Sequence, residues 1–250
     1  MTALVTGATA GLGRAIVERF IKEGIRVVGL GRREERLQEL VKEFGADKFY
    51  GLAADINDRK AVLDGLAKLP ANFADIDMLI NNAGLALGLE PAQEADLDNW
   101  DEMIRTNCQA LVAVTRAVLP GMIERGKGHV VNMGSTAGEW PYFGANVYGA
   151  TKAFVHQFSL NLRADLVGTP VRVTNVEPGL VGGTEFSNIR FGDDGKAAAV
   201  YEGTAPLMPD DIADTVYWAV SRPAHVNINV IQLMPTVQSF AGLSVTRNKK

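Results

Sequence analysis

Short apolar segments alternate with longer amphipathic segments along almost the whole chain. The apolar segments are expected to form strands at residues 3–6, 26–30, 48–53, 77–81, 129–133, 171–177 and 227–233. Between them lie segments of helical periodicity at residues 12–20, 34–44, 58–69, 97–125, 147–167 and 209–221. Parallel strands need crossover connections of about this length, which are usually helices. The pattern therefore predicts an α/β fold: one Rossmann-type, doubly wound parallel sheet of about seven strands with helices on both faces.

Length and composition fit a single domain over residues 1–250. A chain of 250 residues with 47% hydrophobic residues buries a large core. Lys and Arg number 25 against 29 Asp and Glu, so the net charge is −4. This balance argues against a nucleic-acid partner, which requires a basic face. Cys108 is the only cysteine of the sequence, which excludes an internal disulfide and a cysteine-rich metal site.

Neither a membrane partner nor a metal is expected. Residues 223–246 lack Asp, Glu, Lys and Arg, but Asn, Gln and Pro interrupt this stretch, which indicates a strand followed by a tail. The first residues show no basic segment followed by an apolar leader, so a cytoplasmic location is expected. His129 and His156 have no partner spaced like a metal ligand, so no metal site is predicted.

Two segments break the alternation. Residues 181–206 are glycine-rich and irregular, and a stretch of this length within a compact domain is usually functional. We refer to residues 181–206 as the flap and expect it to close over a ligand site. The C-terminal tail, at about residues 235–250, is apolar enough to pack on a neighbouring subunit.

The turn after the first predicted strand is rich in glycine. It reads TGATAGLG from Thr6 to Gly13, between a strand and a helix. Glycine lets the backbone turn tightly and approach a diphosphate, and the following helix directs its free N–H groups toward the same anion. The pattern alone is weak, but the strand and helix alternations that follow favour a dinucleotide site. The residues predicted to contact the dinucleotide here are Thr6, Gly7, Thr9, Gly11, Leu12 and Gly13.

Arg32 and Arg33 follow the second predicted strand, where a site that prefers NAD has an acidic residue. Guanidinium groups suit a 2′-phosphate, whereas a carboxylate would repel it. The alternative is that both arginines are solvated residues at the start of the next helix. Their position favours the first interpretation, so the predicted cofactor is NADP(H).

A tyrosine and a lysine lie four residues apart in the predicted helix 147–167. This spacing places Tyr148 and Lys152 on one face of that helix. Ser135 lies just beyond the strand at 129–133, at the end of a parallel sheet where ligands bind. The three side chains are candidates for proton transfer to a substrate oxygen.

Together these motifs resemble the short-chain dehydrogenase/reductase family. The matching features occur in family order over essentially the whole chain: TGATAGLG, NNAG at residues 81–84, Asn107, Ser135, YGATK at residues 148–152 and Pro178-Gly179. Further segments, among them GLALGLEPA and EPGLVGGTEFSN, are similar to a subgroup of NADP-dependent 3-hydroxy acid dehydrogenases. This subgroup is also described as L-allo-threonine/serine dehydrogenase and malonic semialdehyde reductase. The related NADPH-dependent sulfoacetaldehyde reductases are not separated from it by these motifs.

The resemblance implies a role for each matching residue. Tyr148 would be the general acid, with its pKa lowered by Lys152, which would also hold the nicotinamide ribose. Ser135 would bind the substrate oxygen, and Asn107 would organise a water path toward Lys152. The spacing to Thr184 is one residue longer than the family pattern. The remaining implied cofactor contacts are Asp55, Ile56, Asn82, Ala83 and Gly84 around the adenosine, and Pro178, Gly179, Val181 and Thr184 around the nicotinamide.

The resulting hypothesis is an NADPH-dependent reductase, reversible as an NADP-dependent dehydrogenase. Its substrate would be a short anionic aldehyde or hydroxy acid, such as malonic semialdehyde and 3-hydroxy acids, or sulfoacetaldehyde and isethionate. An NADP-binding sensor on the same fold is the alternative, which the presence of all four residues Asn107, Ser135, Tyr148 and Lys152 disfavours.

Three features of the substrate side stay open at the sequence level. Arg190 in the flap is either the group that binds the substrate anion or a solvated side chain, and Arg247 of a neighbouring subunit is a second candidate. Trp140, Tyr142 and Phe143 form either a pocket wall or a contact with the next subunit. The family resemblance implies a homotetramer built on residues 97–125, residues 148–167 and the last strand.

Overall fold

The computed structural model describes residues 1–240 and contains a seven-stranded sheet of order β3-β2-β1-β4-β5-β6-β7. Every neighbouring pair of strands is parallel. The predicted fold class is confirmed. The strands are β1 (Thr2–Thr6), β2 (Arg26–Gly31), β3 (Phe49–Ala53), β4 (Met78–Asn81), β5 (Gly128–Met133), β6 (Val171–Pro178) and β7 (Val230–Leu233).

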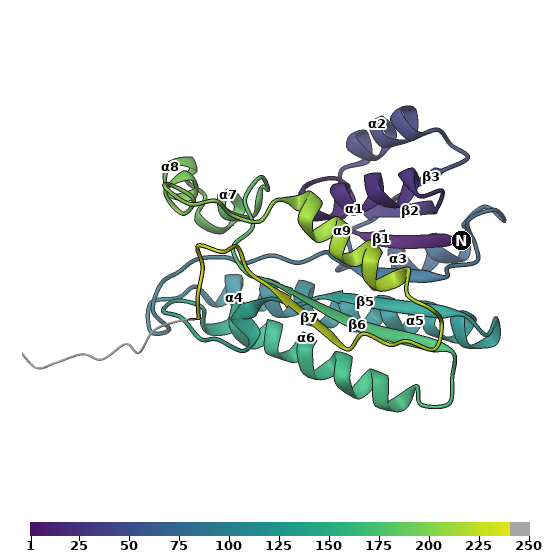
Figure 1. Cartoon of the computed structure of the whole chain (residues 1–250). Coiled ribbons are helices and arrows are strands. Elements are labelled where there is room, and N and C mark those ends of the chain that lie inside the picture. Colours follow the sequence, from purple (N-terminus) through teal and green to yellow (C-terminus); the bar gives the residue numbers. More distant parts are fainter. Residues whose placement is uncertain (241–250) are drawn as a thin grey trace, which may run out of the picture.

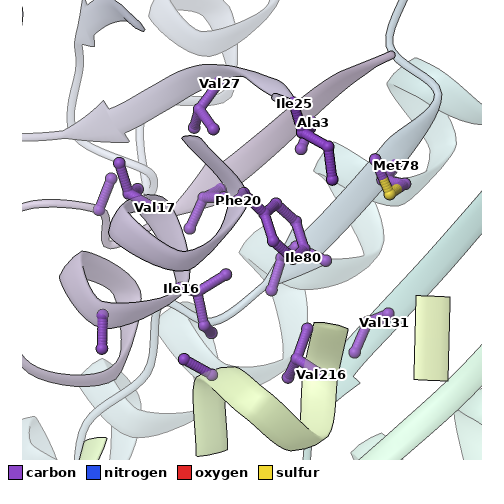
Figure 2. Packing of buried hydrophobic residues seen from close by; sticks show 14 of the residues in the cluster. Ala3, Ile16, Val17, Phe20, Ile25, Val27, Met78, Ile80, Val131 and Val216 are labelled. Carbon is purple, nitrogen blue, oxygen red and sulfur yellow. The ribbon is translucent and has the colours of Figure 1, made fainter. Parts of the chain in front are cut away.

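Helices cover both faces of the sheet (Figure 1). One face packs against α1 (Gly11–Lys22), α2 (Glu34–Phe44) and α9 (Pro209–Val220). Figure 2 shows Phe20 of α1 beside Ile80 of β4, and Val216 of α9 beside Val131 of β5. The other face packs against α3 (Arg59–Ala67), α5 (Leu111–Glu124) and α6 (Asn146–Asp165). Residues buried on both faces explain why the strands are almost continuously apolar.

The chain reverses its direction across the sheet between β1 and β4. The strands β1 to β3 extend toward one edge, and β4 to β7 extend toward the other. Ligands of open α/β sheets bind outside the carboxyl ends of the strands at such a switch point. In Figure 1 the chain begins at the right end of β1, and the flap lies at the left, beside these carboxyl ends.

The flap contains more regular structure than the sequence indicates. It was expected to be irregular, but it forms two short helices, α7 (Phe186–Phe191) and α8 (Asp194–Ala199). Gly192 ends α7 in the left-handed conformation (φ 60°), and the Asp193 carboxylate accepts a hydrogen bond from Lys196 N in the first turn of α8. Each helix has only six residues, too few to show a clear hydrophobic period.

The expected helix at 97–125 is interrupted by one π-helical stretch. It consists of α4 (Leu97–Ile104), the π-helical segment η1 (Arg105–Ala110) and α5. The last strand is shorter than predicted, because the Asn227 side chain takes over the pairing with β6. Its Oδ1 accepts from Val173 N (2.8 Å) and its Nδ2 donates to Val173 O (2.9 Å).

The described part of the tail packs on its own chain. Its expected contact with a neighbouring subunit stays a prediction. Gln238 Oε1 accepts a hydrogen bond from Leu180 N at 2.7 Å, and the rings of Phe240 and Trp140 lie 4.4 Å apart. Arg247, the second candidate for the anion ligand, lies outside the described residues. Within residues 1–240, no helix has the length and apolar character needed to cross a bilayer.

Candidate active site

A cavity of about 640 Å³ opens at the carboxyl ends of the strands, between the sheet and the flap. Most of the residues predicted from the sequence line it, although they come from segments far apart in the chain. These are Gly7, Thr9, Gly11, Leu12, Arg32, Arg33, Asp55, Ile56, Asn82, Ala83, Gly84, Ser135, Tyr148, Lys152, Pro178, Gly179, Val181, Thr184 and Arg190.

Two predicted dinucleotide contacts, Thr6 and Gly13, lie behind the cavity wall and support it. Thr6 Oγ1 accepts hydrogen bonds from the backbone N–H groups of Asn82 (3.0 Å) and Ala83 (2.9 Å). The side chain of Thr6 thus joins the first strand to the NNAG segment. A Cβ at Gly13 would collide with the carbonyl oxygen of Gly7, so glycine there allows close packing of α1 on the turn.

The glycine turn and the start of α1 suit a diphosphate. Gly7 has φ 67° and Gly11 φ 50°, a conformation that favours glycine. No side chain caps α1 at Ala10, and its first turn contains no acidic residue. The first N–H groups of α1 are therefore left for an anion at the cavity wall.

Three arginines gather at the end of the cavity beside the glycine turn. Arg32 and Arg33 both line it, as predicted. Arg33 donates to Thr9 Oγ1 from Nε (3.3 Å) and Nη2 (3.1 Å), and its Nη1 donates to Glu185 in the flap (2.8 Å). Arg36 pairs with the same carboxylate (2.9 Å). Neither Arg36 nor Glu185 was predicted from the sequence. The spacing could have indicated Arg36, because it lies three residues after Arg33, on the same helix face.

Tyr148 and Lys152 are both buried at the base of the cavity. Burial lowers the pKa of Lys152 to about 8. Its Nζ donates to the carbonyl oxygen of Met133 at 2.8 Å. Burial and, to a smaller extent, Tyr142 raise the pKa of Tyr148 to about 12, against the opposing effects of Ser135 and Arg190. Burial has the largest effect on the pKa of Tyr148 in this structure, and the lowering expected from Lys152 together with a bound nicotinamide stays a prediction.

Asn107 does not line the cavity but lies one layer behind it. Its Oδ1 accepts from Leu85 N (2.9 Å), while Nδ2 donates to Leu85 O (2.9 Å) and to Thr151 Oγ1 (3.0 Å). The π-helical segment η1 carries Asn107, and π-helical turns are frequent at functional sites. A Cβ at Gly84 would lie 3.2 Å from Asn107 Oδ1 and 3.5 Å from Lys152 Nζ, so these two groups share one small region.

Arg190 reaches the cavity from α7. Its Nε donates to Gly88 O (3.1 Å) and its Nη1 to the Tyr142 hydroxyl (2.8 Å). The guanidinium carbon lies 5.5 Å from the centre of the Tyr148 ring. Nη2 is buried and has no hydrogen-bond partner among the described residues. Of the three aromatic residues left open by the sequence, Tyr142 lines the cavity, whereas Trp140 and Phe143 do not.

His156 lies close to two glutamates, which its sequence spacing did not indicate. Its Nδ1 lies 2.6 Å from Glu177 Oε1 and 3.7 Å from Glu139 Oε1. Sequence spacing gave no indication of this group, in which the fold brings three potential ligand atoms within 4.8 Å of one another. Gln232 Nε2 donates to Glu139 (3.1 Å) and Glu177 (3.2 Å), which gives these carboxylates partners in a hydrogen-bonded network. The absence of a metal stays a prediction.

A parallel sheet with a glycine turn at its switch point and a buried Tyr–Lys pair defines a dinucleotide-dependent oxidoreductase. Comparison with known proteins agrees. The family model described as short chain dehydrogenase matches residues 1–193. The "NADP-dependent 3-hydroxy acid dehydrogenase YdfG" of Escherichia coli (strain K12) is 60% identical over 248 residues, which covers 99% of this chain and 100% of the relative. The "Serine 3-dehydrogenase" of Rhizobium radiobacter is 52% identical and covers 98% of both chains.

Solved structures give the same assignment. A structure described as the closed form of serine dehydrogenase complexed with NADP+ matches with a TM-score of 0.98 and 60% identity, and covers 99% of this chain and 100% of that chain. A serine dehydrogenase from Escherichia coli matches with a TM-score of 0.85 and 53% identity, and covers 96% and 100%. The chain belongs to the short-chain dehydrogenase family, as its motifs indicated.

Proposed function

We propose that this protein interconverts a short anionic carbonyl compound and the corresponding hydroxy acid with NADP(H). The observation that carries the proposal is the guanidinium of Arg190, which faces the Tyr148 ring at 5.5 Å and has a buried, unpartnered Nη2. A buried charged donor without a partner is costly, so this position suits a ligand anion that would complete the bonding. The names of two relatives, a 3-hydroxy acid and a serine dehydrogenase, support a short hydroxy acid.

The protein is an NADP-dependent oxidoreductase acting on a CH–OH group, and the predicted cofactor is confirmed. The glycine turn, the uncapped start of α1 and the nearby arginines fit a dinucleotide with a 2′-phosphate. We propose that the diphosphate lies on the turn and that Arg32 and Arg33 hold the 2′-phosphate. When bound, NADPH supplies a hydride to the substrate carbonyl.

In our proposal the side chains at the base of the cavity handle the proton. Tyr148, protonated at neutral pH because burial raises its pKa to about 12, donates to the carbonyl oxygen. The Ser135 hydroxyl holds the same oxygen in place. Lys152 lies one helical turn from Tyr148 and holds the cofactor ribose, and a bound cationic nicotinamide ring would favour the phenolate during the reverse reaction. Asn107 fixes Leu85 and Thr151 behind Lys152.

Replacing both Arg32 and Arg33 with alanine is expected to raise KM for NADPH about tenfold or more for each arginine, with a much smaller change for NADH. Each charge-assisted hydrogen bond to the phosphate contributes roughly 1.5–3 kcal/mol, and solvent exposure of both side chains favours the lower value. Steady-state kinetics with the two cofactors measure the difference. Arg59→Ala, an exposed arginine outside the cavity, is the matched control. Equal losses with NADPH and NADH would contradict the assignment.

A substrate panel tests the proposed reaction directly. NADPH consumption is expected with malonic semialdehyde and sulfoacetaldehyde, and NADP+ reduction with 3-hydroxy acids, serine and L-allo-threonine. An uncharged aldehyde of similar size is expected to have a kcat/KM at least tenfold lower, because Arg190 has no anion to bind. The kcat/KM ratio between the carboxylate and the sulfonate selects the physiological class. NADPH binding without turnover of any member would favour the alternative, a sensor on the same fold.

A homotetramer stays our proposal for the assembly. Apolar side chains are exposed on the helices that the family resemblance implicated, at Ile104 of α4, Ile123 of α5, and Phe154 and Leu160 of α6. Exposed apolar patches of this kind support a subunit contact. The mass in solution, measured by light scattering, tests it.

A further inference from the structure

An ion-paired carboxylate connects the flap to the arginines of the cofactor site. Glu185 immediately precedes α7, and its two oxygens accept hydrogen bonds from different arginines. Oε2 lies 2.8 Å from Arg33 Nη1, and Oε1 lies 2.9 Å from Arg36 Nη1. In the sequence, Glu185 lies 152 positions from Arg33 and 149 positions from Arg36. It therefore forms only when the flap lies over this end of the cavity.

Arg33 is shared between the flap and the cavity wall. Its Nε and Nη2 are held by Thr9 Oγ1 in the glycine turn, while Nη1 holds Glu185. Arg36, by contrast, does not line the cavity, and its recorded contact is with Glu185. Hydrogen bonds to both arginines hold the pKa of Glu185 below its ordinary value, so the carboxylate stays ionised at neutral pH.

The opposite end of α7 is anchored at the substrate side. Gly88 N donates to Arg190 O (3.0 Å), and Arg190 Nε donates back to Gly88 O (3.1 Å). Since α7 has six residues, Glu185 and Arg190 move as parts of one short rigid element. Closing the adenosine end of the flap through Glu185 therefore also brings the Arg190 guanidinium to Tyr148.

We propose that Glu185, paired with Arg33 and Arg36, is a positioning residue that holds α7 closed over the bound dinucleotide and thereby places Arg190 at the substrate. We call this contact the latch. In this proposal Arg36 acts through Glu185 and not by touching the 2′-phosphate. The latch rests on the proposed cofactor site, which is tested separately by NADPH binding to the unmodified protein.

The latch predicts faster cofactor release when the carboxylate loses its charge. Stopped-flow fluorescence measures the release of NADPH and NADH from the full-length protein. Glu185→Gln is expected to accelerate release of both cofactors about three- to tenfold, the range of two solvent-exposed ion pairs. Both cofactors respond because the flap lies over the dinucleotide whether or not it has a 2′-phosphate. Glu202→Gln removes an exposed flap carboxylate that has no ion-pair partner within residues 1–240, and it is the matched control.

A double-mutant cycle assigns the partner. Arg36→Met is expected to have part of the effect of Glu185→Gln, because Arg33 still pairs with Glu185, and the double variant is expected to be no worse than Glu185→Gln alone. At saturating NADPH, Glu185→Gln is expected to raise KM for an anionic aldehyde with little change in kcat, because Arg190 is less often in place. Glu185→Asp, which keeps the charge, is expected to recover part of the loss. A purely structural role would not produce this split or this recovery.

Three results would overturn the latch. Tighter NADPH binding by Glu185→Gln would show that the carboxylate competes with the 2′-phosphate for the arginines. A loss in Arg36→Met confined to NADPH would show that Arg36 reads the phosphate itself. Unchanged release rates in both variants would show that the ion pairs are surface contacts only. Failure of the unmodified protein to bind NADPH would instead reject the proposed cofactor site.

Discussion

Tyr148→Phe is expected to lower kcat by about two to four orders of magnitude while leaving the Kd for NADPH almost unchanged. The variant removes the proton that the buried phenol transfers in our proposal, but it retains the aromatic ring, whose centre lies 5.8 Å from that of Phe186. The glycine turn and the arginines are untouched, so cofactor binding persists. Single-turnover absorbance measures the chemical step, and fluorescence titration measures the Kd.

Two companion variants separate proton transfer from other effects. Lys152→Ala is expected to damage both kcat and NADPH affinity, because in our proposal the ammonium holds the cofactor ribose and also contributes the local positive charge. Tyr50→Phe removes a phenol that lies outside the cavity, against Phe73, and is expected to behave like the unmodified protein. Activity of Tyr148→Phe above about one tenth of the original value would show that another group donates the proton.

Arg190→Ala is expected to depress kcat/KM for anionic aldehydes by about one to three orders of magnitude, or about 1.4 kcal/mol for each tenfold step. The guanidinium has one buried nitrogen, Nη2, left for the substrate, because Nε donates to Gly88 O and Nη1 donates to Tyr142. Without this charge-assisted hydrogen bond, a carboxylate or sulfonate in the partly dehydrated cavity is no longer held in one orientation.

The choice of substrate decides whether Arg190 acts on the anion or on the flap. Activity on an uncharged aldehyde of similar size is expected to change little in Arg190→Ala. Tyr142→Phe removes only the Nη1 partner and is expected to cause a smaller loss, specific to anionic substrates. Arg190→Lys keeps the positive charge but lacks the forked guanidinium group. Its loss of kcat/KM for anionic substrates is expected to lie between those of Arg190→Ala and Tyr142→Phe. A uniform loss on charged and uncharged substrates would restrict Arg190 to holding the flap.

The sequence by itself determined the strand and helix order and most of the cavity lining. Periodicity is a local property, so α2 begins at Glu34 and ends at Phe44, as predicted, and the seven strands lie where short apolar runs predict them. The carboxyl ends of parallel strands meet at one edge of a sheet. For this reason the glycine turn and Ser135, which follow different strands, could be assigned to one site from the sequence, whereas Pro178 was placed there by the family resemblance.

Only the tertiary structure decided the contacts that depend on which segments meet. The pairing of Glu185 with Arg33 and Arg36 crosses about 150 positions and has no local signal. The same holds for the burial that raises the pKa of Tyr148 to about 12, since charge proximity is visible in a sequence whereas loss of hydration is not. Asn227 shortens β7 because its side chain happens to face Val173. Helix and strand propensity depends on neighbouring residues in the sequence, whereas loss of hydration and long-range pairing arise only when the chain folds.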